Sequence, residues 1–76
     1  MDSPTLDEAR HAKVEIVEQL KDRNGLSGVG ITMLDGKYAV GVNWQVLPPE
    51  STLPKQIGNV SVIHREVGII RPQGGN

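Results

Sequence analysis

The glycines at the centre of the chain are the first residues whose type and spacing could do chemistry. The stretch GVGITMLDGKYAVGV, residues 28 to 42, contains Gly28-x-Gly30, and glycine-rich loops can cradle phosphate groups. A dinucleotide-binding loop needs G-x-G-x-x-G between a strand and a helix. Here Met33 stands at the third glycine position, no G-K-[ST] segment occurs, and the stretch follows an expected helix. The spacing therefore excludes a phosphate-binding loop of this kind.

Nucleophilic catalysis has no better support in the sequence. None of the serines, at positions 3, 27, 51 and 61, lies in a G-x-S-x-G segment, which is the strand-to-helix turn that exposes a catalytic serine. His64 and Glu66 are two residues apart on an expected strand, a spacing that favours a surface ion pair. The acidic residues near the N-terminus favour a solvated helix face. The sequence predicts no catalytic residue and a protein that is not an enzyme.

Metal and cofactor chemistry is also not expected. The chain has no cysteine and two histidines, His11 and His64, on different expected elements, so neither a disulfide nor a metal site is predicted. In a domain of 76 residues, a single hydrophobic core rarely contributes more than about 3–5 kcal/mol to the folding free energy, so such domains usually need a disulfide, a metal or a partner subunit as well. That leaves oligomerisation or marginal stability, and a homo-oligomer is expected.

Charge and hydropathy restrict the partners. Eight basic residues stand against nine acidic ones without a basic run, and nucleic-acid binding depends on such charge, so no nucleic-acid partner is expected. No apolar run approaches the roughly 20 residues of a membrane span, so no membrane partner is expected either. The N-terminal MDSPTLDEAR is acidic and polar, unlike a secretory signal. The expected location is cytoplasmic.

An amphipathic helix is predicted for residues 5–23. Thr5 followed by Glu8 fits a capping box, and Asn24-Gly25 supplies a residue that can end the helix in the left-handed conformation. One apolar stripe is formed by Ala9, Ala12, Ile16 and Leu20. This stripe is expected to pack on a sheet.

A β-hairpin is predicted next, with strands at about 26–34 and 37–47. Asp35-Gly36 between them favours a type I′ turn, which needs positive φ at both central residues. A two-residue turn fixes the register. The apolar pairs are Met33 with Tyr38, Ile31 with Val40 and Val29 with Val42; the second face pairs Thr32 with Ala39, Gly30 with Gly41 and Gly28 with Asn43.

The rest of the chain is predicted as a loop and one more strand. Three prolines mark residues 48–58 as a loop, and the β-branched residues of 60–70 favour a third strand with a bulge near Gly68. Residues 1–4 and 71–76 are expected to be flexible ends of a single domain that covers residues 5–70.

The expected fold is α+β, with one N-terminal helix packed on a three-stranded, mainly antiparallel sheet in the order α-β-β-β. The helix is expected to cover the apolar face of the hairpin, and Trp44 is favoured as a core residue. The opposite face would lack bulk at its centre, at Gly30 and Gly41.

This bare face is the candidate binding surface. Glycine inside a strand often marks close approach by another backbone or a ligand, and open sheet edges invite strand addition. The candidate contact residues are Gly28, Gly30, Thr32, Ala39, Gly41 and Asn43. Either a partner docks there, or another part of the same chain folds over the face. The leading hypothesis is a non-enzymatic protein-interaction module that self-associates through its sheet.

A series of motifs resembles a known kind of domain. The segments SGVGITMLDGKYAVGVN, LPPESTLPKQIGNVSV and VGIIRP follow the pattern of a small bacterial domain that is found alone or ahead of trypsin-like serine protease domains. The resemblance covers roughly residues 8 to 72. No G-D-S-G-G nucleophile segment is present, so the resemblance implies an accessory or regulatory module and not a protease.

A protease-associated regulator is the alternative function. A propeptide-like or inhibitor-like protein would present the proline-rich loop 48–57 in an extended form, since a loop held by prolines loses less entropy on binding. The contact residues would be Pro48, Pro49, Leu53 and Pro54. An antagonist of some other protein is a third possibility that the composition leaves open.

Overall fold

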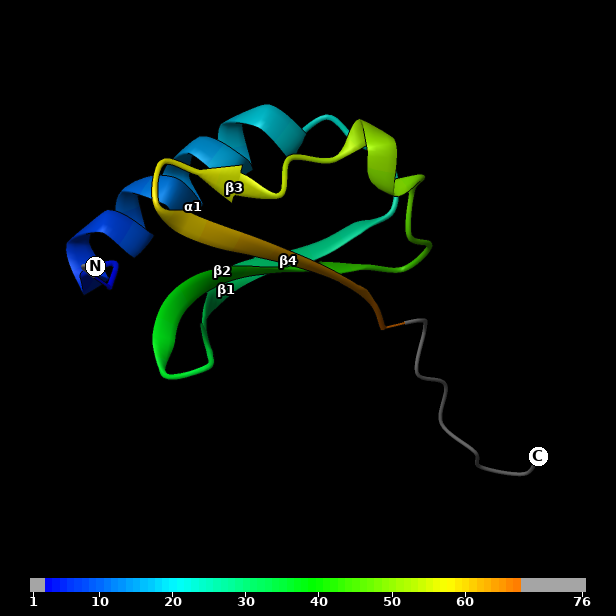
Figure 1. The fold of residues 1–76 in the computed structure, drawn as a ribbon. Helices are drawn as coiled ribbons and strands as arrows, with labels where there is room; N and C mark the ends of the chain where they lie inside the picture. Colours follow the sequence, from blue (N-terminus) through cyan, green and yellow to red (C-terminus); the bar gives the residue numbers. More distant parts are fainter. Residues whose placement is uncertain (1–2, 68–76) are drawn as a thin grey trace, which may run out of the picture.

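A computed structural model describes residues 3–67 of the chain. Its elements are α1 (Leu6–Leu20), β1 (Leu26–Leu34), β2 (Lys37–Trp44), the 3-10 helix η1 (Glu50–Thr52), β3 (Gln56–Ile57) and β4 (Val60–Glu66) (Figure 1). One helix packs on a sheet, which confirms the predicted α+β class.

The sheet differs from the prediction in the number and direction of its strands. It has four strands in the order β1-β2-β4-β3. β2 pairs with β4 in parallel, and the other two pairs are antiparallel. The predicted three-stranded, mainly antiparallel sheet was therefore wrong. Residues 45–59 carry the chain back to the starting end of β2, and β3 within this crossover is only two residues long, too short for a periodic signal.

The capping box at the start of α1 is confirmed. The Glu8 backbone N–H donates to Thr5 Oγ1 at 3.1 Å, and the Thr5 backbone N–H donates to Glu8 Oε1 at 2.8 Å. The helix ends at Leu20, three residues before the predicted end at residue 23. A turn follows in which the Arg23 N–H donates to the Leu20 carbonyl at 2.9 Å, and Gly25, with φ of +88°, leads into β1.

The hairpin register is confirmed at all six predicted pairs. Asp35 and Gly36 have φ of +52° and +78°, as a type I′ turn requires. β2 ends at Trp44 and not at residue 47, because the chain turns away there into the crossover.

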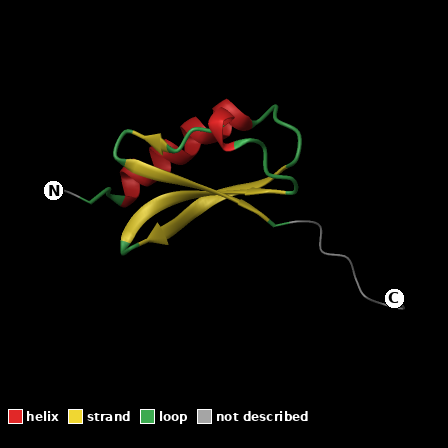
Figure 2. Ribbon diagram, turned by 45° about the vertical axis from the view of Figure 1, so that its right-hand side comes forward, coloured by secondary structure: helices red, strands yellow, loops and turns green. Residues whose placement is uncertain are grey.

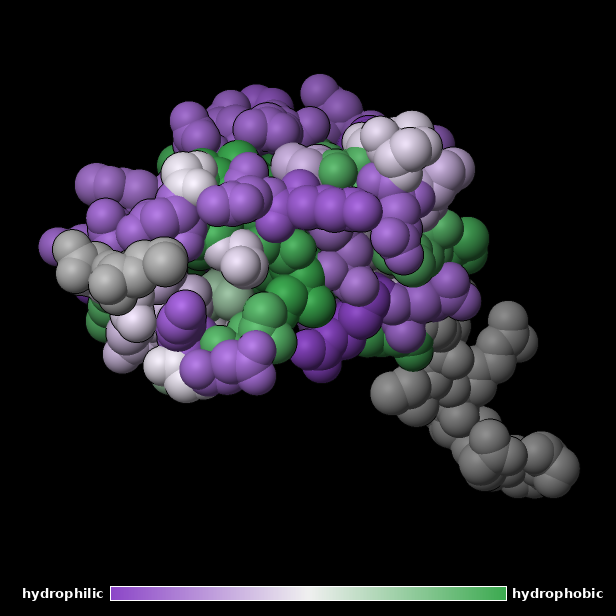
Figure 3. Space-filling view, viewed as in Figure 1, coloured by the Kyte–Doolittle hydropathy of each residue, from purple (hydrophilic) through white to green (hydrophobic). Residues whose placement is uncertain are grey.

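The molecule has two layers, with α1 on one face of the sheet (Figure 2). The apolar stripe of α1 is buried against the side chains that point to it from the strands, and Trp44 has no exposed surface. Hydrophilic residues predominate along the rim of the molecule over α1 (Figure 3), although Val14 of this helix is 61% exposed. The core residues of this layer are Ala9, Ala12, Ile16, Leu20, Val40, Val42, Trp44, Leu53, Val60 and Val62. The prediction that Trp44 is a core residue is thus confirmed.

β4 begins at Val60 as predicted and ends at Glu66. The expected bulge near Gly68 and the tail 71–76 lie outside the described residues, as do residues 1 and 2. Pro4, which the sequence places in a flexible N-terminus, is buried. Within residues 3–67, no helix is long and apolar enough to cross a membrane.

Candidate protein-binding surface

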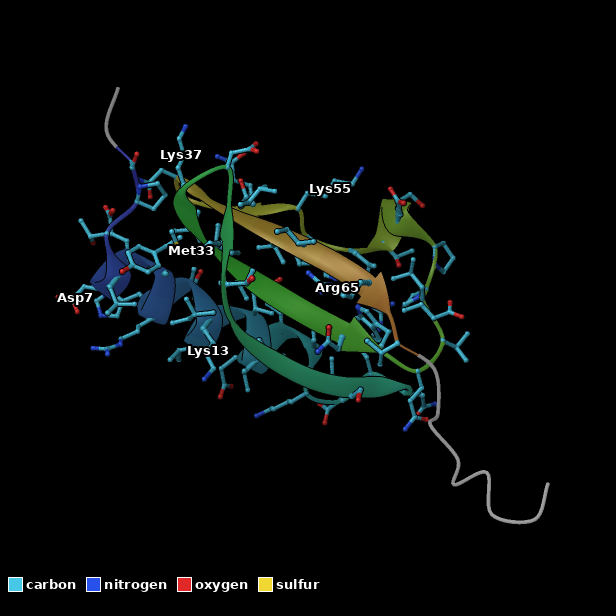
Figure 4. The ribbon with its side chains drawn as sticks, turned by 90° about the horizontal axis from the view of Figure 1, so that it is seen from below. Asp7, Lys13, Met33, Lys37, Lys55 and Arg65 are labelled. Carbon is cyan, nitrogen blue, oxygen red and sulfur yellow. The ribbon has the colours of Figure 1, made fainter. Side chains whose placement is uncertain are left out.

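The six predicted contact residues lie together on the sheet face opposite α1. Gly28, Gly30 and Thr32 of β1 stand beside their partners Asn43, Gly41 and Ala39 of β2. We call these six residues the glycine shelf. Figure 4 looks onto this face, and no element of residues 3–67 crosses it.

Two glycines of the shelf are required neither by positive φ nor by a close neighbour within the described residues, although Gly28 adjoins the register shift of β1. Gly25, Gly36 and Gly58 have positive φ, a conformation that favours glycine. Gly28 and Gly30 do not, and a Cβ built on either would meet nothing within 4 Å. Glycine in a strand costs about 0.5–1 kcal/mol relative to alanine, so the fold of residues 3–67 would be at least as stable with alanine at these two positions.

The centre of the shelf is hollowed. A Cβ on Gly41 would lie 3.4 Å from Thr32 Cγ2, so Thr32 leans toward Gly41. Beside it lies a shallow hollow of about 170 Å³ that reaches from Gly30 to Asn43 and Arg65. The surface can therefore receive a small projecting side chain.

β4 adds three residues to this face that the sequence analysis missed. Ser61 stands beside Ala39. Ile63 stands beside Gly41, and Arg65 stands beside Asn43. Ile63 is half-buried and Arg65 is exposed. One apolar side chain and one positive charge therefore lie beside the glycines at the centre of the shelf. The alternation of Ile63 and Arg65 indicates a shared face, but only the parallel pairing of β2 with β4 places that face beside the glycines.

Ala39 belongs to the shelf by register but offers no surface. It has 0% exposure, because Thr32 and Ser61 flank it from the neighbouring strands. Of the six predicted contact residues, Ala39 is therefore inaccessible to a partner, and the other five retain exposed area.

The outer edge of β1 forms a second surface that the other elements of residues 3–67 leave open. β1 is a terminal strand of the sheet, and its nine residues, LSGVGITML, include no charge and no proline. Most proteins protect an edge of this kind with charges, proline or bulges. The pairing register of β1 shifts once, between Leu26 and Gly28 near the start of the strand. The rest of the strand is regular.

His64 has different partners from the one that its sequence spacing favours. The Trp44 indole N–H donates to His64 Nδ1 at 3.0 Å, and His64 Nε2 lies 2.7 Å from the Pro54 carbonyl oxygen. Glu66 accepts a hydrogen bond from the Leu47 backbone N–H at 3.1 Å. The expected His64–Glu66 ion pair was therefore wrong, because both side chains bind the crossover segment instead.

These contacts hold the crossover on the sheet. Both ring nitrogens of His64 are engaged. The Arg23 guanidinium lies 5.9 Å from the Trp44 ring centroid and donates to Thr52 Oγ1 at 3.3 Å. The cluster joins the end of α1, β2, η1 and β4, and its evident role is structural.

The proline-rich loop is less extended than expected. It contains η1 and β3, and Leu53 is buried at 7% exposure. The Pro54 carbonyl faces His64. Two of the four predicted loop contacts, Leu53 and Pro54, are therefore engaged by the fold itself. The other two remain accessible in part, since Pro48 is half-buried and Pro49 is exposed.

Glu8 lies in a hydrogen-bonded environment that favours its ionised form. Its carboxylate accepts from the Thr5 backbone N–H and from the Asn59 side chain, at 2.8 and 3.4 Å. These hydrogen bonds, that from the Thr5 backbone first, hold the pKa of Glu8 below its ordinary value of 4.5. The carboxylate therefore joins the start of α1 to the β3–β4 turn. Within residues 3–67, no group of three potential ligand side chains could hold a metal ion.

Comparison of the chain with protein-family models, with curated proteins and with solved structures found no match. The resemblance to a protease-associated bacterial domain therefore stays a prediction.

Proposed function

We propose that the protein is a non-enzymatic protein-interaction module that binds through the part of the sheet that α1 leaves free. The single observation that carries the proposal is the open space above Gly28 and Gly30. Glycine weakens a strand, and these two have neither positive φ nor a close neighbour within residues 3–67. Close approach of another protein to the β1 backbone would explain both.

The surface chemistry fits a protein partner. The shelf is hollowed and uncharged at its centre, with apolar Ile63 and charged Arg65 at one side. A hollow of about 170 Å³ suits one side chain better than a small-molecule ligand, since ligand pockets usually span about 300–1,000 Å³. Self-association is the simplest use of such a surface in a small domain that has no cysteine to form a disulfide.

The protease-regulator alternative has weaker support. It requires an extended loop at residues 48–57, yet Leu53 belongs to the core cluster and the Pro54 carbonyl is engaged by His64. The geometry therefore favours the sheet over the loop as the binding element.

The experiment is a comparison of the wild-type chain with Gly30→Val and Ser51→Val. Ser51 is exposed on η1, away from the shelf, so its valine variant controls for added apolar bulk. Light scattering after size exclusion measures self-association, and mass spectrometry of affinity-captured material measures other partners. Loss of a specific complex in Gly30→Val alone supports the proposal. If every complex survives the valine at Gly30, the shelf is not the binding surface.

A further inference from the structure

We infer that a second copy of this chain occupies the glycine shelf and docks there with the outward face of its α1. This inference rests on the proposed function, since it takes the shelf as the binding surface, and it names the partner and the contact. The outward face is the side of α1 opposite the buried stripe, and it includes Asp7, His11, Val14 and Glu18. Each copy offers one helix and one shelf, so the copies stack head to tail.

The strands place positive charge and no carboxylate on the shelf side of the sheet. Successive side chains of a strand point to opposite faces, so Lys37, two residues before Ala39, lies on this side. Arg65 lies there as well, because it pairs with Asn43. Figure 4 shows Lys37 and Arg65 toward opposite ends of the face. Glu66 is the only acidic residue of the described strands, and as the neighbour of Arg65 it points to the other face.

The outward face of α1 is acidic around one exposed apolar side chain. Val14 is 61% exposed, with Asp7 two turns before it and Glu18 one turn after it on the same side of the helix. Glu15 lies on the flank toward β3, where it lines a groove together with Ile57. A projecting valine between carboxylates complements a hollow between cations.

The direction of α1 relative to the strands defines how two copies can stack. Residues 21–25 are a short connection between α1 and β1, so these two elements run in opposite directions, and the hairpin then reverses the chain again. α1 therefore runs roughly parallel to β2, as Figure 1 shows. A simple translation of one copy places its α1 over the shelf of the next, parallel to the β2 below it.

The cations of the shelf lie at unequal distances from its centre. Arg65 stands beside the residue two positions after Gly41, which is about 7 Å along β2. Lys37 stands four positions before Gly41, which is about 13 Å in the other direction. A partner that matches both cations must carry its acidic groups with the same asymmetry.

The acidic residues of α1 have this asymmetry. Measured along the helix axis, Glu18 follows Val14 by about 6 Å and Asp7 precedes it by about 10 Å. With Val14 seated in the hollow and α1 parallel to β2, Glu18 reaches Arg65 and Asp7 approaches Lys37. The remaining difference of about 3 Å at Lys37 lies within the reach of a lysine side chain. The reversed helix direction would lose both matches.

The basic residues of α1 are compatible with this contact. Arg10 and Lys13 line the groove on the β1 side of the helix. Translation keeps that side over β1 of the next copy, and β1 carries no charged residue. The opposite flank, with Glu15, lies over β4 and so beside Arg65.

Glu18 can bind Arg65 although it has a partner in its own helix. Lys21 Nζ lies 3.3 Å from Glu18 Oε1, and the two side chains are 56% and 67% exposed. Surface ion pairs of this kind contribute about 0–1 kcal/mol. A carboxylate has two oxygens that can each accept more than one hydrogen bond, so the guanidinium can join the pair.

The centre of the sheet is suited to a second helix. Parallel strands are usually covered by helices on both faces, and the parallel pair of β2 with β4 lies in the middle of this sheet with α1 on one face only (Figure 2). The bare backbone at Gly30 and Gly41 permits close approach. The hollow of about 170 Å³ beside them can hold the isopropyl group of Val14.

The test disables the two surfaces one at a time and then mixes the variants, with analytical ultracentrifugation as the readout. Gly30→Val fills the shelf, and Val14→Arg sets a positive charge against it, so we expect each to raise the dissociation constant of the assembly by about tenfold or more. An equal mixture of the two should form a complex of one chain of each and nothing larger, because each chain supplies the surface that the other lacks. Val46→Arg is the matched control, since Val46 is 70% exposed and lies beyond the end of β2.

Each other result overturns the inference in a distinguishable way. Loss of the assembly in Gly30→Val but not in Val14→Arg would show that the shelf binds a second copy through a different surface. Loss in both without a complex in the mixture would show that like surfaces meet. A wild-type monomer at every concentration would exclude a second copy and leave the shelf open to another protein. Assembly unchanged in both variants would overturn the proposed function as well.

Discussion

Trp44 and His64 form a directed pair across the parallel strands β2 and β4. The indole Nε1–H donates to His64 Nδ1 at 3.0 Å, with the ring centroids 6.1 Å apart and the planes inclined by 34°. The indole nitrogen can only donate, so Nδ1 must accept. The proton of the neutral ring therefore lies on Nε2 and is donated to the Pro54 carbonyl.

Replacement of His64 by phenylalanine should destabilise the protein. The variant keeps an aromatic ring but leaves the N–H of the buried Trp44 without its acceptor. An unsatisfied buried polar group costs about 1–3 kcal/mol, and we expect this loss in the free energy of unfolding measured with urea. His11→Phe is the control, because His11 is exposed on α1. Equal losses in the two variants would contradict the role given to His64.

Nitrogen chemical shifts of His64 provide an independent check of the same pair. The geometry requires the Nε2–H tautomer, so Nδ1 should show the shift of an unprotonated nitrogen. A proton on Nδ1 would point toward the indole N–H and is incompatible with the 3.0 Å contact.

The hairpin could be predicted because its determinants are local. Asp35-Gly36 sets the turn, and the turn length sets which residues face each other. Thr5 and Glu8 define the start of α1 in the same way. The six shelf residues were thus placed together correctly from the sequence.

The placement of β4 could not be predicted because it depends on contacts between distant segments. Ile63 and Arg65 join the shelf only through the parallel pairing with β2, which the crossover makes possible. The sequence spacing favoured Glu66 as the partner of His64. The observed partners, Trp44 and Pro54, are 20 and 10 residues away.

The two kinds of glycine should respond differently to alanine. Gly30 has open space for a Cβ, and alanine loses less backbone entropy on folding, so Gly30→Ala should hold or raise the free energy of unfolding. Gly36 has φ of +78°, where an L side chain costs roughly 1–2 kcal/mol, so Gly36→Ala should lower it by that amount. Urea titration of dilute protein measures both. A loss in Gly30→Ala as large as that in Gly36→Ala would show that Gly30 is required by the fold.

Leu53 should hold the crossover, residues 45–59, against the core. Its side chain is buried within the core cluster, and truncation of a buried leucine to alanine costs about 2–5 kcal/mol. We expect Leu53→Ala to lower the urea midpoint strongly. Leu34→Ala is the control, because Leu34 is 43% exposed and its truncation should change the free energy by less than about 0.5 kcal/mol. A small effect at Leu53 would mean that the crossover can detach without loss of the core.

Glu8 should make the stability of the protein depend on pH in the acidic range. Its pKa is lower in the folded protein than the ordinary value of 4.5, chiefly through the Thr5 backbone hydrogen bond and then through Asn59. The ionised carboxylate therefore stabilises the fold. Its contribution is complete above about pH 4.5 and is lost as the pH falls through the lower value of the folded state.

A Glu8→Gln variant isolates this contribution, because glutamine keeps the shape of the capping box without the charge. Thermal melting at several pH values between neutral and acidic conditions should show the wild-type protein as the more stable at neutral pH. The difference should shrink as the pH falls below the ordinary pKa of glutamate, since the wild-type side chain then becomes neutral as well. Asp7→Asn, in the same first turn of α1 but without a hydrogen bond to Asn59, is the matched control. A difference between wild type and Glu8→Gln that stays constant with pH would mean that Glu8 acts through its shape and not through its charge.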